Sequence, residues 1–201
     1  MKKRKLSSIS FLQLLNYAET IFLIKLHLLM KKFFKRFFLL LLLIFIVIQF
    51  FRPEKNISTG ISANDITVKY AVPADVQTIL KTSCYNCHSN NTAYPWYNNI
   101  QPVAWWLADH IKEGKREVNF SEFASYRIGR QYKKLEDINN EVKEGAMPLD
   151  SYTFIHGYAK LNQQQKLSIA NWVTTLRDSI KAQYPQDSLK RPQRPPVPQS
   201  K

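Results

Sequence analysis

The sequence predicts an all-α domain preceded by one apolar N-terminal helix. Four stretches after residue 70 place apolar residues at helical spacing, and a proline or a polar capping residue precedes three of them. An apolar run, residues 37–51, lies ahead of these stretches. With 201 residues, the chain has room for one domain of ordinary size and for additional segments.

The positive charge of the chain is confined to its two ends. Residues 1–52 contain ten Lys or Arg and one Glu, and residues 181–201 contain five Lys or Arg and one Asp. Residues 53–180 are nearly balanced, with fourteen basic and thirteen acidic side chains. The high net charge therefore does not indicate nucleic-acid binding. It indicates a membrane-flanking segment and a basic tail.

The N-terminal segment has the pattern of a signal anchor. Four basic residues between 31 and 36 precede the apolar run, which only Gln49 interrupts. A cleavable signal peptide is the alternative, but no small-residue cleavage site follows the run. We expect a membrane helix over residues 30–52, a cytoplasmic amino end and the following domain anchored on the periplasmic side.

Residues 1–29 fit poorly ahead of this anchor. Their weaker apolar stretch is interrupted by Glu19, Lys25 and His27, and Met30 would itself make a suitable start. We interpret residues 1–29 as an over-extended reading frame or a cytoplasmic segment. Residues 53–71 have little periodicity and are expected to form an extended linker.

The first helix of the domain, which we place at residues 72–184, is expected to begin near Pro73. Its apolar side chains fall at i, i+3, i+4, i+8 and i+11, and the last two are the only cysteines in the chain: Val76, Ile79, Leu80, Cys84 and Cys87. Both cysteines therefore lie on the apolar stripe of this helix.

The cysteines form a Cys-x-x-Cys-His motif with the histidine that follows them. This spacing is the attachment signature of one c-type haem. Two thiols add across the vinyl groups of the porphyrin, and the adjacent imidazole binds the iron. We expect Cys84 and Cys87 to carry the thioethers and His88 to be the first metal ligand.

Other interpretations of the motif have less support in the sequence. A structural zinc site needs four Cys or His ligands, but the chain has no further cysteine, and its other histidines are scattered. A thioredoxin-like dithiol would follow a strand, whereas the residues before Cys84 have a helical pattern. A disulfide between such close cysteines would stabilise the fold little.

Aromatic residues dominate the next two stretches. Tyr94 and Trp96 belong to a Tyr-Pro-Trp-Tyr segment, and Trp106 and His110 lie on the apolar stripe of a helix that begins at Pro102. These aromatic rings are expected to wall the porphyrin, with core packing as the alternative. His110 is a candidate iron ligand, although a core histidine or a propionate partner fits its position better.

A loop over residues 114–125, with Ser121 as a possible cap, separates this helix from the third. The third helix ends at Gly145 and places one apolar face toward the core: Ile128, Tyr132, Leu135, Ile138 and Val142. Its charged residues are expected to face solvent.

Met147 is the candidate sixth ligand of the iron. It is the only methionine after residue 30, and it follows Gly145 in a loop that ends in Pro148. A thioether opposite a histidine raises the potential of a haem iron. Because Met147 lies sixty residues after Cys87, between two helices, it can approach the opposite face of the ring.

The last helix is expected to begin at Asn162, with Gln165 completing a capping box. It buries one stripe and packs across the first helix: Ile169, Trp172, Val173, Leu176 and Ile180. Residues 185–201 are rich in proline and are expected to be a disordered tail.

Taken together, these motifs resemble the bacterial haem-binding domain family, a cytochrome c-like group. The resemblance covers residues 70–182 and rests on Cys84 to His88, Tyr94 to Tyr97, Trp105-Trp106, Asn119 to Ser121 and Gly145 to Pro148. It implies a cytochrome c-like helical fold around one covalently attached haem c, outside the cytoplasm. It implies no substrate.

We therefore expect a membrane-anchored monohaem cytochrome domain that passes single electrons to redox partner proteins, with His88 and Met147 as axial ligands. We expect an electron carrier in preference to an enzyme. A haem peroxidase or a gas or redox sensor with an open distal site is the main alternative. A haem-free interaction module is a third.

Overall fold

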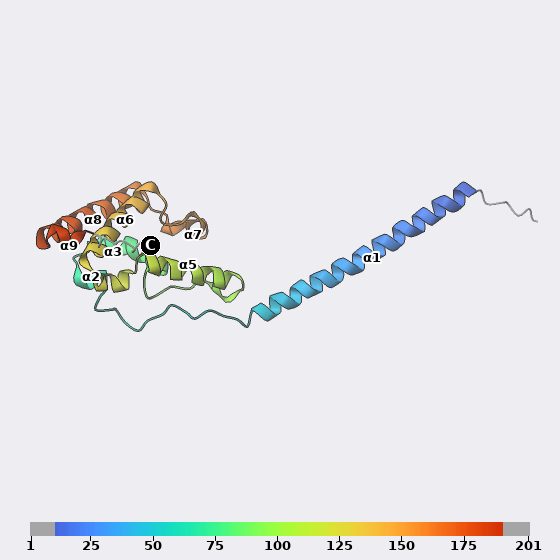
Figure 1. Ribbon diagram of the computed structural model, residues 1–201, viewed down its shortest axis with the longest axis horizontal. Helices are drawn as coiled ribbons and strands as arrows, with labels where there is room; N and C mark the ends of the chain where they lie inside the picture. Colours follow the sequence, from blue (N-terminus) through green and yellow to red (C-terminus); the bar gives the residue numbers. More distant parts are fainter. Residues whose placement is uncertain (1–10, 191–201) are drawn as a thin grey trace, which may run out of the picture. The chain divides into compact units, whose positions relative to one another are not determined.

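The computed structural model describes residues 11–190 of the chain, and in these residues every regular element is helical (Figure 1). The all-α prediction is therefore confirmed. Clustering divides the chain between Arg52 and Pro53 into two compact units. The N-terminal unit contains helix α1 (Phe11–Ile48).

The expected membrane helix over residues 30–52 is not supported by the structure. No helix in residues 11–190 combines the length and the apolar character that crossing a bilayer requires. The uncharged segment of helix α1 is short, because four basic residues lie between positions 31 and 36 and the helix ends at Ile48. The predicted translation start at Met30 stays untested, and residues 1–10 lie outside the described residues.

The second unit contains all the remaining helices. In chain order these are α2 (Ile66–Lys69), α3 (Ala74–Ser83), α4 (Tyr85–His88), η1 (Trp96–Asn99), α5 (Val103–Glu117), η2 (Phe120–Ser125), α6 (Ile128–Glu144), α7 (Asp150–Ile155), η3 (Gly157–Ala159), α8 (Gln163–Gln183) and α9 (Gln186–Leu189). Helices α6 and α8 run side by side, and α8 also packs against α3 (Figure 1). The expected packing of the last helix across the first is thus observed.

Helix α8 follows its sequence pattern closely. The side chain of Asn162 accepts a hydrogen bond from the backbone of Gln165, and the side chain of Gln165 accepts one from the backbone of Asn162, both at 2.9 Å. All five apolar residues predicted to be buried in this helix lie in the core: Ile169, Trp172, Val173, Leu176 and Ile180.

The other helices depart from their patterns in ways that shape the site. The first predicted helix is broken at Cys84, where φ is −123° and ψ is −43°, so Cys84 forms the kink between α3 and α4 and Cys87 follows it in α4. Helix α5 continues to Glu117, and Asn119 rather than Ser121 caps η2. Helix α5 buries Ala104, Leu107 and Ile111, so Trp106 and His110 lie beside the buried stripe instead of on it.

Residues 53–71 are not a free linker. The side chain of Ile66 is fully buried in the core, and the amide of Asn56 donates a hydrogen bond of 2.6 Å to Tyr94 Oη. The predicted tail is likewise ordered at its start, because α9 packs against α6. Residues 191–201 lie outside the described residues.

Candidate haem-binding site

Two adjoining cavities lie where α3, α4, α5, α6 and the loop after α6 meet. Their volumes are about 280 and 270 Å³. Cys84, His88 and Met147 line both cavities, as do Glu117 and Pro148. Residues that the sequence separates by about sixty positions therefore share one site.

One hydrogen bond determines the orientation of His88. Its Nδ1 lies 3.0 Å from the carbonyl oxygen of Val118, which directly follows α5. Because a carbonyl oxygen only accepts, Nδ1 carries the proton and Nε2 keeps its lone pair. Burial also lowers the pKa of His88, although its bond to Val118 acts in the opposite direction. The imidazole is thus held neutral, the form that binds a metal.

Both cysteines are free thiols. Burial raises the pKa of Cys84 to about 12, with a smaller contribution from the neighbouring Cys87. Burial also raises the pKa of Cys87. A reactive redox dithiol needs a lowered thiol pKa. The structure therefore gives no support to the thioredoxin-like interpretation.

Gly114 brings helix α5 close to the cysteine segment. A Cβ atom added at this position would lie 2.8 Å from the carbonyl oxygen of Cys87 and 3.1 Å from its Cβ. Real Cβ atoms do not approach backbone oxygens this closely. Glycine at position 114 therefore allows α5 to form one side of the second cavity, directly against Cys87.

The end of helix α6 positions Met147. Gly145 ends the helix with φ at +78°, a left-handed conformation that glycine adopts without a steric penalty. The amide of Met147 then donates a hydrogen bond of 3.1 Å to the carbonyl of Glu141, back in the last turns of α6. The half-buried side chain of Met147 lines both cavities.

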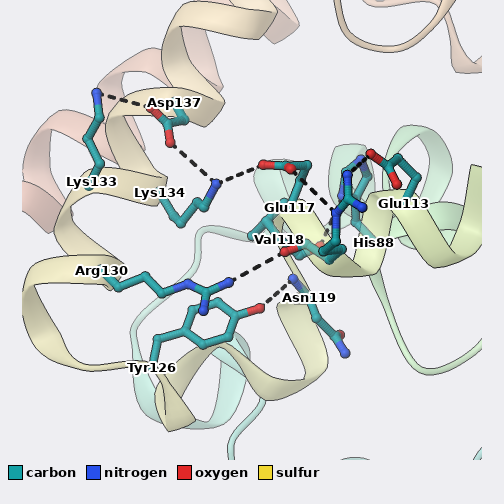
Figure 2. Close-up of polar contacts among 11 residues, drawn as sticks. His88, Glu113, Glu117, Val118, Asn119, Tyr126, Arg130, Lys133, Lys134 and Asp137 are labelled. Atoms are coloured by element: carbon teal, nitrogen blue, oxygen red, sulfur yellow. Dashed lines mark hydrogen bonds and ion pairs between the residues drawn. The ribbon is translucent and has the colours of Figure 1, made fainter. Parts of the chain in front are cut away.

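Charged residues at the rim hold the segment that carries Val118. Figure 2 shows Lys134 between Glu117 and Asp137, at 3.1 and 3.5 Å. Since the side chain of Lys134 is only 18% exposed, these ion pairs are partly shielded from solvent. On the other side of Val118, the amide of Asn119 donates a hydrogen bond of 2.9 Å to Tyr126 Oη. Helix α6 and Tyr126 thus fix the backbone that orients His88.

The predicted aromatic wall is largely absent from the cavities. Tyr94 accepts its hydrogen bond from Asn56, Trp96 is 76% exposed, and Trp106 packs on the ring of His110 at 4.2 Å. None of these three aromatic residues lines either cavity. The rings lie elsewhere because the Tyr-Pro-Trp-Tyr segment packs against residues 53–71 and α7.

His110 does line the second cavity. Its Nδ1 lies 2.9 Å from the carbonyl oxygen of Trp106, one turn earlier in α5. As with His88, the carbonyl requires a proton on Nδ1, so Nε2 is the nitrogen with a lone pair.

Several residues of the second cavity were not among the predicted site residues, and two of them bond to each other. Asn86 lies between the cysteines, and its Nδ2 donates a hydrogen bond of 2.7 Å to Tyr152 Oη. Burial raises the pKa of Tyr152 to about 12, so its hydroxyl stays protonated. Asn86 could have been suspected from its place inside the motif, but no sequence pattern singles out Tyr152.

The residues present fit a haem better than a bare metal ion. Among residues 11–190, no group of three or more His, Cys, Asp or Glu side chains is arranged to hold a metal ion. The site instead offers two thiols, a neutral imidazole, a thioether and an apolar lining. That lining includes Val118, Phe120, Ile138, Val142 and Leu161.

Comparison with known families agrees with this chemistry. A family model described as a haem-binding domain matches residues 43–175. The match begins well ahead of residue 70, the start of the resemblance noted in the sequence. It therefore includes residues 53–71, which belong to the second unit and contribute Ile66 to its core. No curated protein and no solved structure matches the chain.

Proposed function

The chain belongs to the haem-binding domain family, and on this premise we propose that it is a monohaem c-type cytochrome that transfers single electrons. One observation carries the proposal. Cys84, His88 and Met147 line the same two cavities, and His88 is held with its Nε2 available as a ligand. Cys87 lines the second cavity beside them.

In this proposal four side chains hold the cofactor. Cys84 and Cys87 would carry the thioether bonds, and His88 and Met147 would be the ligands of the iron. The backbone carbonyl of Val118 keeps the proton on Nδ1 of His88, which orients the ring and strengthens Nε2 as a donor. A bound haem iron supplies a one-electron couple, whose potential the Met147 thioether raises.

We further propose that the domain works outside the cytoplasm and exchanges electrons with redox partner proteins. The support for this location is chemical, because c-type haem is attached in extracytoplasmic compartments.

Covalent attachment is tested by producing the chain together with a haem-attachment system. We expect haem to stay with the denatured chain, as seen by haem staining of a denaturing gel. The Cys84→Ala, Cys87→Ala double variant should lose all staining, whereas Ser83→Ala, a change beside the motif, should keep it. Loss of haem from the denatured wild-type chain would contradict the c-type assignment.

A haem peroxidase or sensor is the second candidate, and His110 favours it. The residue lines the second cavity with a lone pair on Nε2, so it can accept a proton there if the distal position is open. The spin state of the ferric protein separates the two functions. A low-spin spectrum supports electron transfer, whereas a high-spin spectrum supports the peroxidase or sensor.

A further inference from the structure

We propose that Tyr152 is a positioning residue, whose hydrogen bond with Asn86 keeps Met147 in place as the sixth ligand. The inference rests on the proposed function, because it assigns a purpose to the Met147 loop at the same site. It adds a residue from α7, a helix that the sequence did not predict.

The Asn86 end of this hydrogen bond is fixed by other contacts. Its Nδ2 donates to Tyr152 Oη at 2.7 Å, while its Oδ1 accepts from the amide of Ala93 at 3.0 Å. The backbone carbonyl of Asn86 also accepts from Thr92 Oγ1 at 2.7 Å. Asn86 is thus held from three directions, and its amide donor is aimed at Tyr152.

The Tyr152 end is equally constrained. Its ring stacks on His156 at a centroid distance of 4.5 Å, and Nε2 of His156 lies 2.6 Å from Tyr97 Oη in η1. The amide of Tyr152 donates a hydrogen bond of 3.0 Å to the carbonyl of Leu149. Tyr152 therefore links α7 to both η1 and the cysteine segment.

Met147 lies between two attachments of its loop. The first is the hydrogen bond from its own amide to the carbonyl of Glu141, and the second is the Asn86–Tyr152 bond, five residues later. Pro148 and Leu149, the residues in between, line the second cavity together with Met147 and Tyr152. Breaking the second attachment leaves this side of the loop held only through His156 and Tyr97, farther along the chain from Met147, so Met147 is more easily displaced.

The bond joins the two segments that carry the axial ligands. Asn86 lies two residues before His88, and Tyr152 follows Met147 in the same loop and helix. A hydrogen bond that only stabilised the fold would affect unfolding without changing competition at the iron. A positioning bond changes that competition, because an added ligand must displace Met147.

The test is imidazole binding to the ferric holoprotein, followed by its absorption spectrum. Tyr152→Phe keeps the ring that stacks on His156 but removes the hydroxyl. We expect imidazole to bind about three- to tenfold more tightly to it, the factor that one hydrogen bond represents. Asn86→Ala should have a similar effect, and the double variant should show no further gain, because both changes remove the same bond.

Tyr132→Phe is the matched control. Tyr132 belongs to α6, its ring contacts Arg177 at 4.2 Å, and it lines neither cavity. Its imidazole affinity should equal that of the wild type. Equal affinities in the wild type and Tyr152→Phe, or additive effects in the double variant, would overturn the inference. If Tyr152→Phe fails to fold, faster amide exchange over residues 149–156 in Asn86→Ala is the expected result, and unchanged exchange contradicts it.

The Met147→Ala variant distinguishes failure of the positioning role of Tyr152 from failure of Met147 as a ligand. Tighter imidazole binding to Met147→Ala but not to Tyr152→Phe would reject the positioning role alone. Unchanged binding to Met147→Ala would mean that Met147 is not a ligand, which rejects the axial pair and the positioning role together. Absence of covalent haem would reject the proposed c-type cytochrome itself.

Discussion

The hydrogen bond from His88 to Val118 connects the motif to the rest of the fold. It selects the imidazole nitrogen that is free, and it does so through a backbone carbonyl that no side-chain pattern reveals. The carbonyl is in turn held by neighbours that pair with α6 and Tyr126. At this scale the motif predicts which residue binds the iron. The backbone after α5 determines which nitrogen of that residue is available.

Replacing Met147 provides the most direct residue-scale test of the axial pair. We expect Met147→Ala to give a high-spin ferric spectrum and a lower reduction potential, because the thioether that favours the reduced iron is lost. Potentiometric titration and ferric absorption spectra measure both effects. Leu149→Ala, which shortens another side chain of the second cavity, should leave the spectrum low-spin. An unchanged low-spin spectrum in Met147→Ala would point to His110 as the ligand.

Gly114 provides a second residue-scale prediction. An added methyl group at this position would press on the backbone of Cys87, so Gly114→Ala should lower the free energy of unfolding by about 1–3 kcal/mol. Urea denaturation measures this change. Gly157→Ala is the control, because nothing lies within 4 Å of its added Cβ. Equal losses in both variants would mean that the contact with Cys87 is not the cause.

At the scale of elements, the features that depend on neighbouring residues were predicted, and those that depend on contacts between helices were not. The capping box and buried stripe of α8 depend on residues a few positions apart, and both were predicted correctly. The break at Cys84 depends on contacts between helices, as does the burial of Ala104 on α5 in place of Trp106 and His110. Hydrophobic periodicity does not encode such contacts. The same reason explains the site: Cys84, Cys87, His88, Met147 and His110 line the cavities, but Tyr94, Trp96 and Trp106 do not.

The cap of α8 gives an element-scale prediction. Asn162→Ala removes the side-chain acceptor for the amide of Gln165, so it should destabilise the domain by about 1 kcal/mol. Thermal or urea unfolding measures the loss. Asn171→Ala, an exposed change in the middle of the same helix, should not destabilise the domain. A larger loss in Asn171→Ala than in Asn162→Ala would show that the capping box contributes little.

At the scale of the whole domain, the two cavities lie at a junction of several helices. The apolar side chains that line the first cavity continue into the main core, where Val118, Phe120, Val142 and Leu161 are all buried. A group held there would therefore contact the core directly. A covalently attached haem would stay with the unfolded chain, but its contacts with the core and with Met147 would form only in the folded state and would stabilise that state.

The haem-free chain should consequently be less stable than the loaded one. We expect the Cys84→Ala, Cys87→Ala double variant, prepared without haem, to melt at least about 2–4 °C lower than the holoprotein, which corresponds to a difference of about 1 kcal/mol for a unit of about 150 residues. Amides of α4 and the Met147 loop should exchange faster, since their neighbours across the cavities are missing. Amides near Ile169 and Val173, in the part of the core that does not line the cavities, should remain the most protected. Equal melting temperatures and equal exchange in the two forms would mean that the domain completes its core without the cofactor, and that the cavities are not where the cofactor binds.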